Sequence, residues 1–426
     1  MGTVRNYGRN LRFTPRRHLF PQTSVELAAI VRESARVRVV GAAHSWSPAI
    51  VTDDTLVSVD RMRGVISLDR DAMQVTVQAG MRLSELNAYL DEHGLALTSL
   101  GSIVGQSVAG VIATGTHGSG RNFRCISTQV ARLQLVDGRG EDVTLERDHP
   151  DFAGAVVGLG ALGVVHAITY DVVPAFRLHD ITGTRPFDDA IEHIDEIVAS
   201  GDHVKLWWLP PGDDAIVFRY DRTGEPANDS KLRRWVQERL ISVAVYRSLL
   251  VVGRLSGRRL VPAINRFLTG QAGRSIDRIS PSHIGFLTPI PPVHAESEWA
   301  FDVRDAKPIL REYRRLLPDA GHSYNFIQEI RFSKADDLWL SPAYYRDSMW
   351  LSLYNIDRAG WPAQLAKFEA FARAHGGRPH WGKQATFEHA YLRGQYPRLA
   401  DFAALAARFD PERKFRNAWL DDILGD

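Results

Sequence analysis

Three segments rich in small residues that leave the backbone permissive lie within the first 165 residues, and each adjoins a short apolar run. They occupy positions 41–45, 110–120 and 158–165. Glycine lets a backbone approach a ligand closely, and successive backbone N–H groups in such a turn form a cradle for a phosphate. Close packing of strands also uses glycine. Three such segments in one region favour a large phosphate-bearing cofactor more than any one of them does alone.

The second segment, 110–120, departs from the common phosphate-binding fingerprints. It contains no Gly-x-Gly-x-x-Gly with an acidic residue about twenty positions later, and no Gly-Lys-Ser or Gly-Lys-Thr. Neither a Rossmann site nor a P-loop is supported.

Short strands and helices are expected to alternate from residue 24 to residue 174. A first helix begins with Ser24 as its N-cap, and a strand over 37–40 runs into the turn at Gly41. A second helix, 83–93, is expected to end at Gly94.

From about 178 to 375 the pattern changes to longer helices and isolated strands. The run 207–209 closes a strand, and 215–220 is expected to pair with it as a hairpin. A chain of 426 residues exceeds the ~250–300 residues at which a single core stops growing. Two domains are therefore expected.

The composition excludes several classes of protein. With 52 basic and 50 acidic residues the net charge is +2, too small an excess for a dedicated nucleic-acid binder. The one cysteine, Cys125, rules out an intrachain disulfide and a zinc site built from several cysteines. The first ten residues lack the apolar core of a signal peptide, so we expect a cytoplasmic protein.

A basic region, 231–259, combines lysine and arginine with apolar stretches. Its longest clean apolar run, 249–253, is far below the ~20 residues that span a bilayer. The simplest interpretation is a pair of amphipathic helices with solvated basic faces. A helix that lies weakly on a membrane surface is the sharper alternative, and a nucleic-acid face is the third.

Four side chains are candidates for chemistry beyond the glycines. His44 follows the first turn directly and would sit beside a bound ligand, although an incidental histidine is the simpler interpretation. Glu329 and Arg331 lie two apart, so in a strand they share a face and form either a salt bridge or a substrate clamp. Lys383, close to Trp381, is either a cation–π partner or a cofactor contact.

Taken together, these segments resemble the vanillyl-alcohol-oxidase-type flavoproteins, and within them the aldonolactone oxidases and alditol oxidases. In the first half the resemblance rests on Val-Gly-Ala-Ala-His-Ser at 40–45, on 107–120, and on Leu-Gly-Ala-Leu-Gly-Val-Val at 159–165. In the second half it rests on Glu-Ile-Arg at 329–331, on 340–347, and on Arg-Pro-His-Trp-Gly-Lys at 378–383.

The resemblance implies an α+β fold built in three parts. A two-subdomain FAD-binding domain of the PCMH type is expected over residues 1–176. An α/β substrate domain with an antiparallel sheet follows over 177–375. The C-terminal segment, 376–426, is expected to pack back on the FAD domain and return to the flavin.

The resemblance also implies a role for each matching residue. His44 falls on the histidine that bonds covalently to the flavin, and Lys383 on a lysine near the flavin's pyrimidine end. Glu329, Arg331 and Ser102 fall on residues that face the substrate. The remaining positions implied to contact FAD are Gly41, Ala42, Ala43, Ser45, Gly101, Ser107, Gly110, Thr114, His117, Gly118, Gly163 and Val165.

The implied reaction is oxidation of a hydroxyl group of an aldono-1,4-lactone or related polyol. Hydride passes to flavin N5, and molecular oxygen reoxidises the flavin to give hydrogen peroxide. Gly101 falls where a small residue lets oxygen reach the flavin. Lys383 would stabilise the negative charge of the reduced ring. Glu329 is either the group that takes the substrate proton or an orienting carboxylate.

The sequence departs from the family pattern at two places, and the first of them keeps the substrate open. The substrate histidine of the alditol oxidases has no counterpart, and Ser352 stands at the aligned position. Ala42 and Ala43 replace the small pair in a turn that is commonly Gly-x-Gly-His-Ser. The alternatives are therefore an alditol, a nucleoside or another sugar-bearing metabolite as substrate, or a dehydrogenase that uses another electron acceptor. No metal site is expected.

Overall fold

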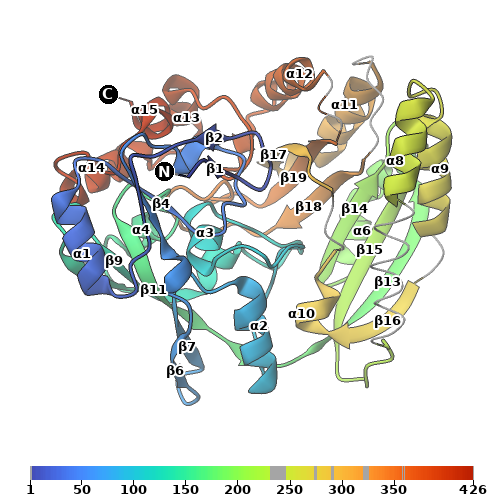
Figure 1. Ribbon diagram of the computed structural model, residues 1–426. Helices are drawn as coiled ribbons and strands as arrows, with labels where there is room; N and C mark the ends of the chain where they lie inside the picture. Colours follow the sequence, from blue (N-terminus) through green and yellow to red (C-terminus); the bar gives the residue numbers. More distant parts are fainter. Residues whose placement is uncertain are drawn as a thin grey trace.

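The computed structural model describes most of the chain in atomic detail. The described residues are 2–230, 246–272, 276–288, 292–319, 326–356, 358 and 360–425. The first half of the basic region, 231–245, lies outside them. Figure 1 shows two β-rich halves beside each other, with the C-terminal helices above the N-terminal half.

The N-terminal half contains a small parallel sheet, and one of its strands leads directly into the turn at 41–45. Its strands, in order across the sheet, are β3 (Arg17–Leu19), β5 (Thr55–Ser58) and β4 (Val37–Val40). Helix α1 (Ser24–Glu33) connects β3 to β4 and buries Leu27, Ala28 and Val31 against them. The chain leaves β4 directly into the turn at Gly41. The short hairpin of β1 (Val4–Arg5) and β2 (Arg12–Phe13) precedes this sheet.

The second sheet of this half is antiparallel and five-stranded. Its strands, in order, are β10 (Asp142–Glu146), β9 (Val130–Val136), β11 (Val164–Asp171), β7 (Gln74–Gln78) and β6 (Val65–Asp69). The other elements here are α2 (Leu83–Glu92), β8 (Leu95–Ala96), α3 (Val108–Ala113), α4 (Phe152–Ala155), β12 (Val173–Pro174), and the 3-10 turns η1 (Pro48–Ile50), η2 (Val59–Arg61) and η3 (Ile126–Gln129).

The second half is organised by an eight-stranded antiparallel sheet. Its order is β16 (Ile276–Pro281), β13 (Arg177–Pro186), β15 (Asp214–Thr223), β14 (His203–Trp208), β18 (Gln328–Ser333), β19 (Ser348–Asn355), β17 (Ala295–Asp302) and β20 (Arg378–Pro379). The expected hairpin is confirmed as β14 and β15.

Helices cover one face of this sheet and leave the other to a cavity. The covering helices are α5 (Phe187–Glu192), α6 (Ile194–Ala199), α11 (Ala306–Asp319) and α12 (Trp361–Ala374). Ile330 of β18 is fully buried in their shared core. Because side chains alternate along a strand, its neighbours Glu329 and Arg331 point to the opposite face. The remaining elements of this half are α8 (Tyr246–Leu255), α9 (Val261–Ala272), α10 (Ser282–Gly285) and the turn η5 (Val303–Asp305).

The C-terminal segment joins the two halves. After β20, helices α13 (His389–Gln395), α14 (Leu399–Phe409) and α15 (Ala418–Leu424) bury side chains in the core of the five-stranded sheet. The buried Arg38 of β4 donates to the carbonyl of Phe415 at 2.5 Å and to that of Gly160 at 3.1 Å. The guanidinium of Arg38 thus connects the strand before the first turn to the segment 158–165 and to the C-terminal segment through hydrogen bonds. The domain limits at 176 and 375 stay predictions.

Candidate active site

A cavity of about 820 Å³ lies between the two halves, within the ~300–1,000 Å³ typical of small-molecule sites. The three segments of small residues, 41–45, 110–120 and 158–165, all line it, together with the open face of the large sheet and Lys383. The predicted residues that line the cavity are Gly41, Ala42, Ala43, His44, Ser45, Gly101, Ser102, Ser107, Gly110, Thr114, His117, Gly163, Val165, Glu329, Arg331 and Lys383.

Gly118 is the predicted flavin contact that is absent from this lining. A Cβ built on it would lie 2.5 Å from the carbonyl oxygen of Leu100. Its small size is therefore needed where two loops pack against each other. Gly163 serves both purposes: it lines the cavity, and a Cβ there would lie 2.3 Å from the carbonyl oxygen of Val136 in the neighbouring strand.

The first turn presents His44 to the cavity in a fixed orientation. A Cβ on Gly41 would lie 1.9 Å from Ser107 Oγ, so the turn packs directly on the residue that caps α3. Ala43 has φ +52°, a left-handed conformation that glycine adopts without strain. The imidazole of His44 stacks on Tyr7, with ring centroids 4.7 Å apart.

His44 is neutral at physiological pH. Burial, with a smaller effect from the positive charges of Arg82 and Lys383, lowers its pKa to about 4. A neutral imidazole keeps a nitrogen lone pair, which a protonated ring lacks. The ring is therefore in the form required of a nucleophile.

Ser102, Glu329 and Arg331 meet on one wall of the same cavity. Arg331 Nη2 donates to Glu329 Oε2 at 2.5 Å and to Ser102 Oγ at 2.9 Å. The buried Lys205 of β14 joins them, with its Nζ 3.6 Å from Glu329 Oε1 and 3.4 Å from Ser102 Oγ. Lys205 also donates to Thr288 Oγ1 at 3.1 Å. Two cations thus contact the serine, and both also contact the carboxylate of Glu329.

Donors already surround the carboxylate of Glu329. Trp207 Nε1 donates to Oε1 at 2.9 Å, and the Tyr354 hydroxyl donates to Oε2 at 3.3 Å, in addition to Arg331 and Lys205. Burial alone would raise the pKa of Glu329, but the charges of Arg331 and Lys205 outweigh burial and lower it to about 2. Burial lowers the pKa of Lys205 to about 8, although Glu329 opposes that change.

Lys383 is held at the edge of the cavity by a carboxylate. Its Nζ lies 2.5 Å from Glu296 Oε1 and 4.6 Å from the centre of the Trp46 ring. Glu296 Oε2 lies 3.3 Å from His294 Nε2. Burial would raise the pKa of Glu296, but the charge of Lys383 lowers it overall. Of the two alternatives for Lys383, a cation–π contact is present, and its partner is Trp46 rather than Trp381.

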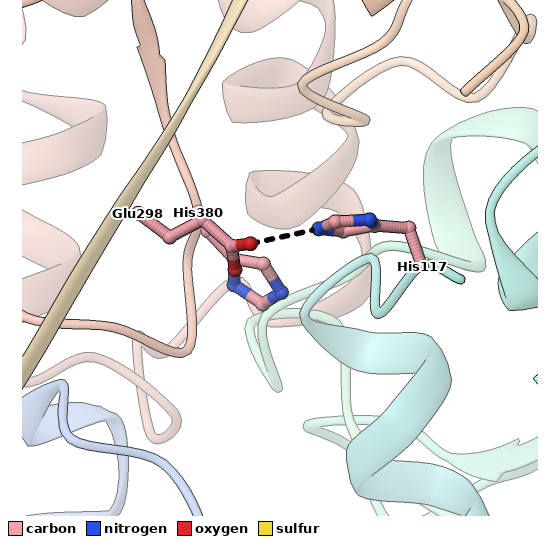
Figure 2. A group of neighbouring side chains, drawn as sticks. All are labelled: His117, Glu298 and His380. Atoms are coloured by element: carbon pink, nitrogen blue, oxygen red, sulfur yellow. Dashed lines mark ion pairs between the residues drawn. The ribbon is translucent and has the colours of Figure 1, made fainter. Parts of the chain in front are cut away.

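His117, Glu298 and His380 form a buried polar cluster beside this pair. Figure 2 shows the carboxylate of Glu298 directed at His117, whose Nε2 lies 3.4 Å from Oε1. The potential ligand atoms of the three residues lie within 4.8 Å of one another, so they could hold a divalent metal. Each of them also has a protein partner: Gly118 O for His117, the Gly382 N–H for His380, and the Ser352 hydroxyl for Glu298. Ser352 thus lies behind the cavity wall.

Two models of known protein families match this chain. The family model for D-arabinono-1,4-lactone oxidase matches residues 168–423. The chain belongs to the D-arabinono-1,4-lactone oxidase family. A second model, for an FAD binding domain, matches residues 15–146. This member of the family is therefore an FAD-dependent oxidoreductase. Its glycine-lined cavity fits that cofactor because three permissive backbone segments converge on one space.

Several characterised proteins are similar to this member of the D-arabinono-1,4-lactone oxidase family over nearly its whole length. L-gulono-1,4-lactone dehydrogenase of Mycobacterium tuberculosis is 31% identical and covers 95% of each chain. Alditol oxidase of a Streptomyces species is 32% identical over 99% of each chain. L-gulonolactone oxidase of Bos taurus is 30% identical over 95% of this chain and 94% of its own. Oxidases and a dehydrogenase thus occur among the relatives.

A solved structure of cholesterol oxidase from Brevibacterium sterolicum has the same fold. Its TM-score is 0.83 over 99% of this chain and 96% of that chain, at 16% identity. Identity this low relates the fold alone. The expected α+β architecture, an FAD domain with a large antiparallel sheet domain, is confirmed.

Sequence reasoning missed several residues of the site in this family member. They are Lys205, Trp207, Glu296, Glu298 and Tyr354. One signal was available, because Glu296 and Glu298 are two charges at alternate positions of one strand, as are Glu329 and Arg331. Lys205 within His-Val-Lys-Leu-Trp-Trp carries the same signal.

Proposed function

We propose that this protein oxidises a hydroxyl group of an aldono-1,4-lactone or a closely related polyol. FAD would be attached covalently through His44, and molecular oxygen would be the electron acceptor, giving hydrogen peroxide. The observation that carries the proposal is the wall of Ser102, Glu329 and Arg331 on the same cavity as the His44 turn. Membership in the aldonolactone oxidase family supports the substrate class.

The hydrogen bonds of that wall favour a substrate with acceptor oxygens. A hydroxyl oxygen has two lone pairs and one proton. Arg331 and Lys205 both donate to Ser102 Oγ. The proton of Ser102 is therefore the part left to bind a ligand. Because donors already surround the carboxylate of Glu329, this wall presents hydrogen-bond donors to a ligand and few free acceptors. The carbonyl and ring oxygens of a lactone accept hydrogen bonds and donate none, which fits such a wall.

The cavity residues of this chain would have separate roles in the proposed reaction. Arg331 and Ser102 orient the substrate oxygens, and Glu329 holds Arg331 in place. When bound, FAD would supply the hydride-accepting and electron-transferring chemistry, and the small residues of the three permissive segments would hold it. Lys383, whose charge Glu296 holds at the cavity edge, would stabilise negative charge at the pyrimidine end of the flavin. Gly101 leaves space on the cavity wall for oxygen.

A peroxide-coupled substrate screen on the FAD-loaded protein, which should be yellow, tests the proposal. Aldono-1,4-lactones, alditols and nucleosides are supplied in turn, and peroxide release is followed at steady state. The highest kcat/KM is expected with a lactone. Turnover that needs an added dye and yields no peroxide would instead identify a dehydrogenase. Faster oxidation of alditols or nucleosides would overturn the lactone assignment.

Covalent attachment has a separate test that needs no substrate. After denaturation and acid precipitation the pellet of the wild-type protein is expected to stay yellow, and His44→Ala to give a colourless pellet. Tyr7→Leu, which removes the ring stacked on His44 but leaves the imidazole itself in place, serves as the matched control and should keep part of the attached flavin. A colourless wild-type pellet would refute the assignment. The cytoplasmic location expected from the N-terminus stays a prediction.

A further inference from the structure

Exposed apolar side chains concentrate on one helical hairpin at the edge of the second half. Among the described residues, nine large hydrophobic side chains are exposed, and five of these lie between positions 251 and 267. They are Val251, Val252, Leu255, Leu260 and Phe267. Single exposed apolar residues are ordinary, but a local group of them marks an interaction surface.

Of these side chains, Phe267 also lines the cavity, and the other four lie outside the cavity lining. Helices α8 and α9 are joined by a turn in which Gly257 and Arg258 have φ +59° and +69°. A Cβ on Gly253 would lie 3.3 Å from Val261, so the two helices pack closely. Asn265 donates to the carbonyl of Pro210 at 2.7 Å and anchors α9. Figure 1 shows α8 and α9 together along the outer side of the large sheet.

The spacing on α8 gives one exposed apolar stripe. Val251 and Leu255 lie four apart, and Val252 and Leu255 three apart, so the three share a face of the helix. Leu255 is 84% exposed. On the other side of α8, Leu250 is buried and Gly253 faces α9.

The charge of the hairpin is strongly one-sided. Residues 246–272 contain five arginines and no acidic residue, although the whole chain has a net charge of only +2. The arginines are Arg247, Arg254, Arg258, Arg259 and Arg266. A cationic helix pair with exposed aliphatic side chains is the pattern of a segment that lies in the headgroup region of an anionic bilayer.

Two other occupants fit this surface less well. A symmetric contact with a second copy would bring the same patch against itself, and five arginines from each copy would repel one another. A nucleic acid would use the arginines but leave the aliphatic stripe in water. The hairpin is also too short to span a bilayer: among the described helices, none has the length and apolar character needed for a crossing.

We propose that the α8–α9 hairpin docks this protein on the surface of an anionic lipid bilayer. Leu255, Val252 and Val251 enter the headgroup region, and the arginines at the turn contact lipid phosphates. Phe267 and Leu268 of α9 also line the cavity, so docking brings one wall of the active site to the membrane surface. This inference does not depend on the identity of the substrate.

Flotation with vesicles tests the proposal on the purified holoprotein. Vesicles of phosphatidylcholine are compared with vesicles in which about a third of the lipid is phosphatidylglycerol. The protein is expected to float with the anionic vesicles and to be released by high salt, because exposed charges are screened. Wild-type protein that stays at the bottom with anionic vesicles at low salt would overturn the proposal.

Two double variants and two matched controls locate the contact. Val252→Ser with Leu255→Ser removes apolar surface, and Arg258→Glu with Arg259→Glu reverses the charge at the turn. Each pair is expected to lower the partition coefficient at least tenfold, since one basic residue contributes about fivefold and one buried aliphatic side chain about tenfold. Ile66→Ser, at an exposed apolar residue on β6, and Arg12→Glu on β2 should bind like the wild type.

Folding and self-association are read in the same samples. Unchanged thermal unfolding of the variants shows that lost flotation is not lost structure. If the control variants lose as much binding as the hairpin variants, the contact lies elsewhere and the proposal is wrong. A concentration-dependent dimer in light scattering that Leu255→Ser abolishes, without vesicle binding, would assign the surface to a second copy instead.

Discussion

The buried carboxylate of Glu329 gives a stability prediction that can be worked out from the structure. Its ordinary pKa of 4.5 is lowered to about 2 in the fold. Each tenfold change in proton affinity corresponds to ~1.36 kcal/mol. The ionised group therefore contributes about 3 kcal/mol to the free energy of unfolding at pH 7. Glu329→Gln should remove this contribution and leave Lys205 and Arg331 as unpaired buried cations, a change that typically costs 3–5 kcal/mol.

The pH dependence of the effect has a definite sign. A carboxylate whose pKa is lowered on folding stabilises the protein above its unfolded pKa, and that contribution is lost as the pH falls towards the folded pKa. For Glu329 the window runs from about 4.5 down to about 2. The difference between wild type and Glu329→Gln should shrink from about 3 kcal/mol at pH 7 to roughly 1.4 kcal/mol at pH 3.

Urea unfolding followed by tryptophan fluorescence measures both values. Glu92→Gln at the exposed end of α2 is the control and should change stability by less than ~0.5 kcal/mol. Adding Lys205→Met to Glu329→Gln should restore part of the loss, because it removes a cation that burial already disfavours. A loss below ~1 kcal/mol in Glu329→Gln, or no recovery in the double variant, would refute the account of this network.

Three further predictions concern the cavity itself. Lys383→Ala should lower kcat roughly 100-fold while flavin is retained, since a charge that acts in the transition state is removed. An unchanged rate of flavin reduction in stopped-flow measurements would contradict this role. Gly101→Val should slow reoxidation by oxygen more than reduction by substrate, and equal effects on both half-reactions would contradict the oxygen path. Ala43→Gly should keep stability within ~1 kcal/mol, whereas Ala43→Val at φ +52° should cost roughly 1–2 kcal/mol more, as thermal unfolding would show.

Local patterns in the sequence predicted the parts of the site that depend on neighbours along the chain. The turn at 41–45 follows β4 as expected, and the alternation along β18 places Glu329 and Arg331 on one face. The start of α1 was misplaced by one residue. Thr23, not Ser24, is the N-cap, and its hydroxyl accepts the N–H of Glu26 at 3.1 Å. Both residue types cap helices well, so the sequence alone does not separate them.

The missed residues depend on the order of strands in the large sheet. Strand β18 lies between β14 and β19, which places Trp207 opposite Glu329 although 122 positions separate them. Such pairings follow from long-range packing and from no local periodicity. Glu296 and Glu298 reach the cavity for the same reason, because β17 lies beyond β19 from the strand that carries Arg331.

The structure also bears on a choice that the sequence left open, whether Glu329 takes the substrate proton or only orients. A general base works best when its pKa is near the working pH. With a pKa of about 2, protonating Glu329 at pH 7 is unfavourable by about 7 kcal/mol. Taking a proton would also disrupt the hydrogen bonds from Trp207 and Tyr354. The carboxylate therefore serves to fix Arg331 and, through it, Ser102. The same four donors that make Glu329 stable make it a poor base, so in the proposed reaction the proton of the substrate hydroxyl would leave by another route.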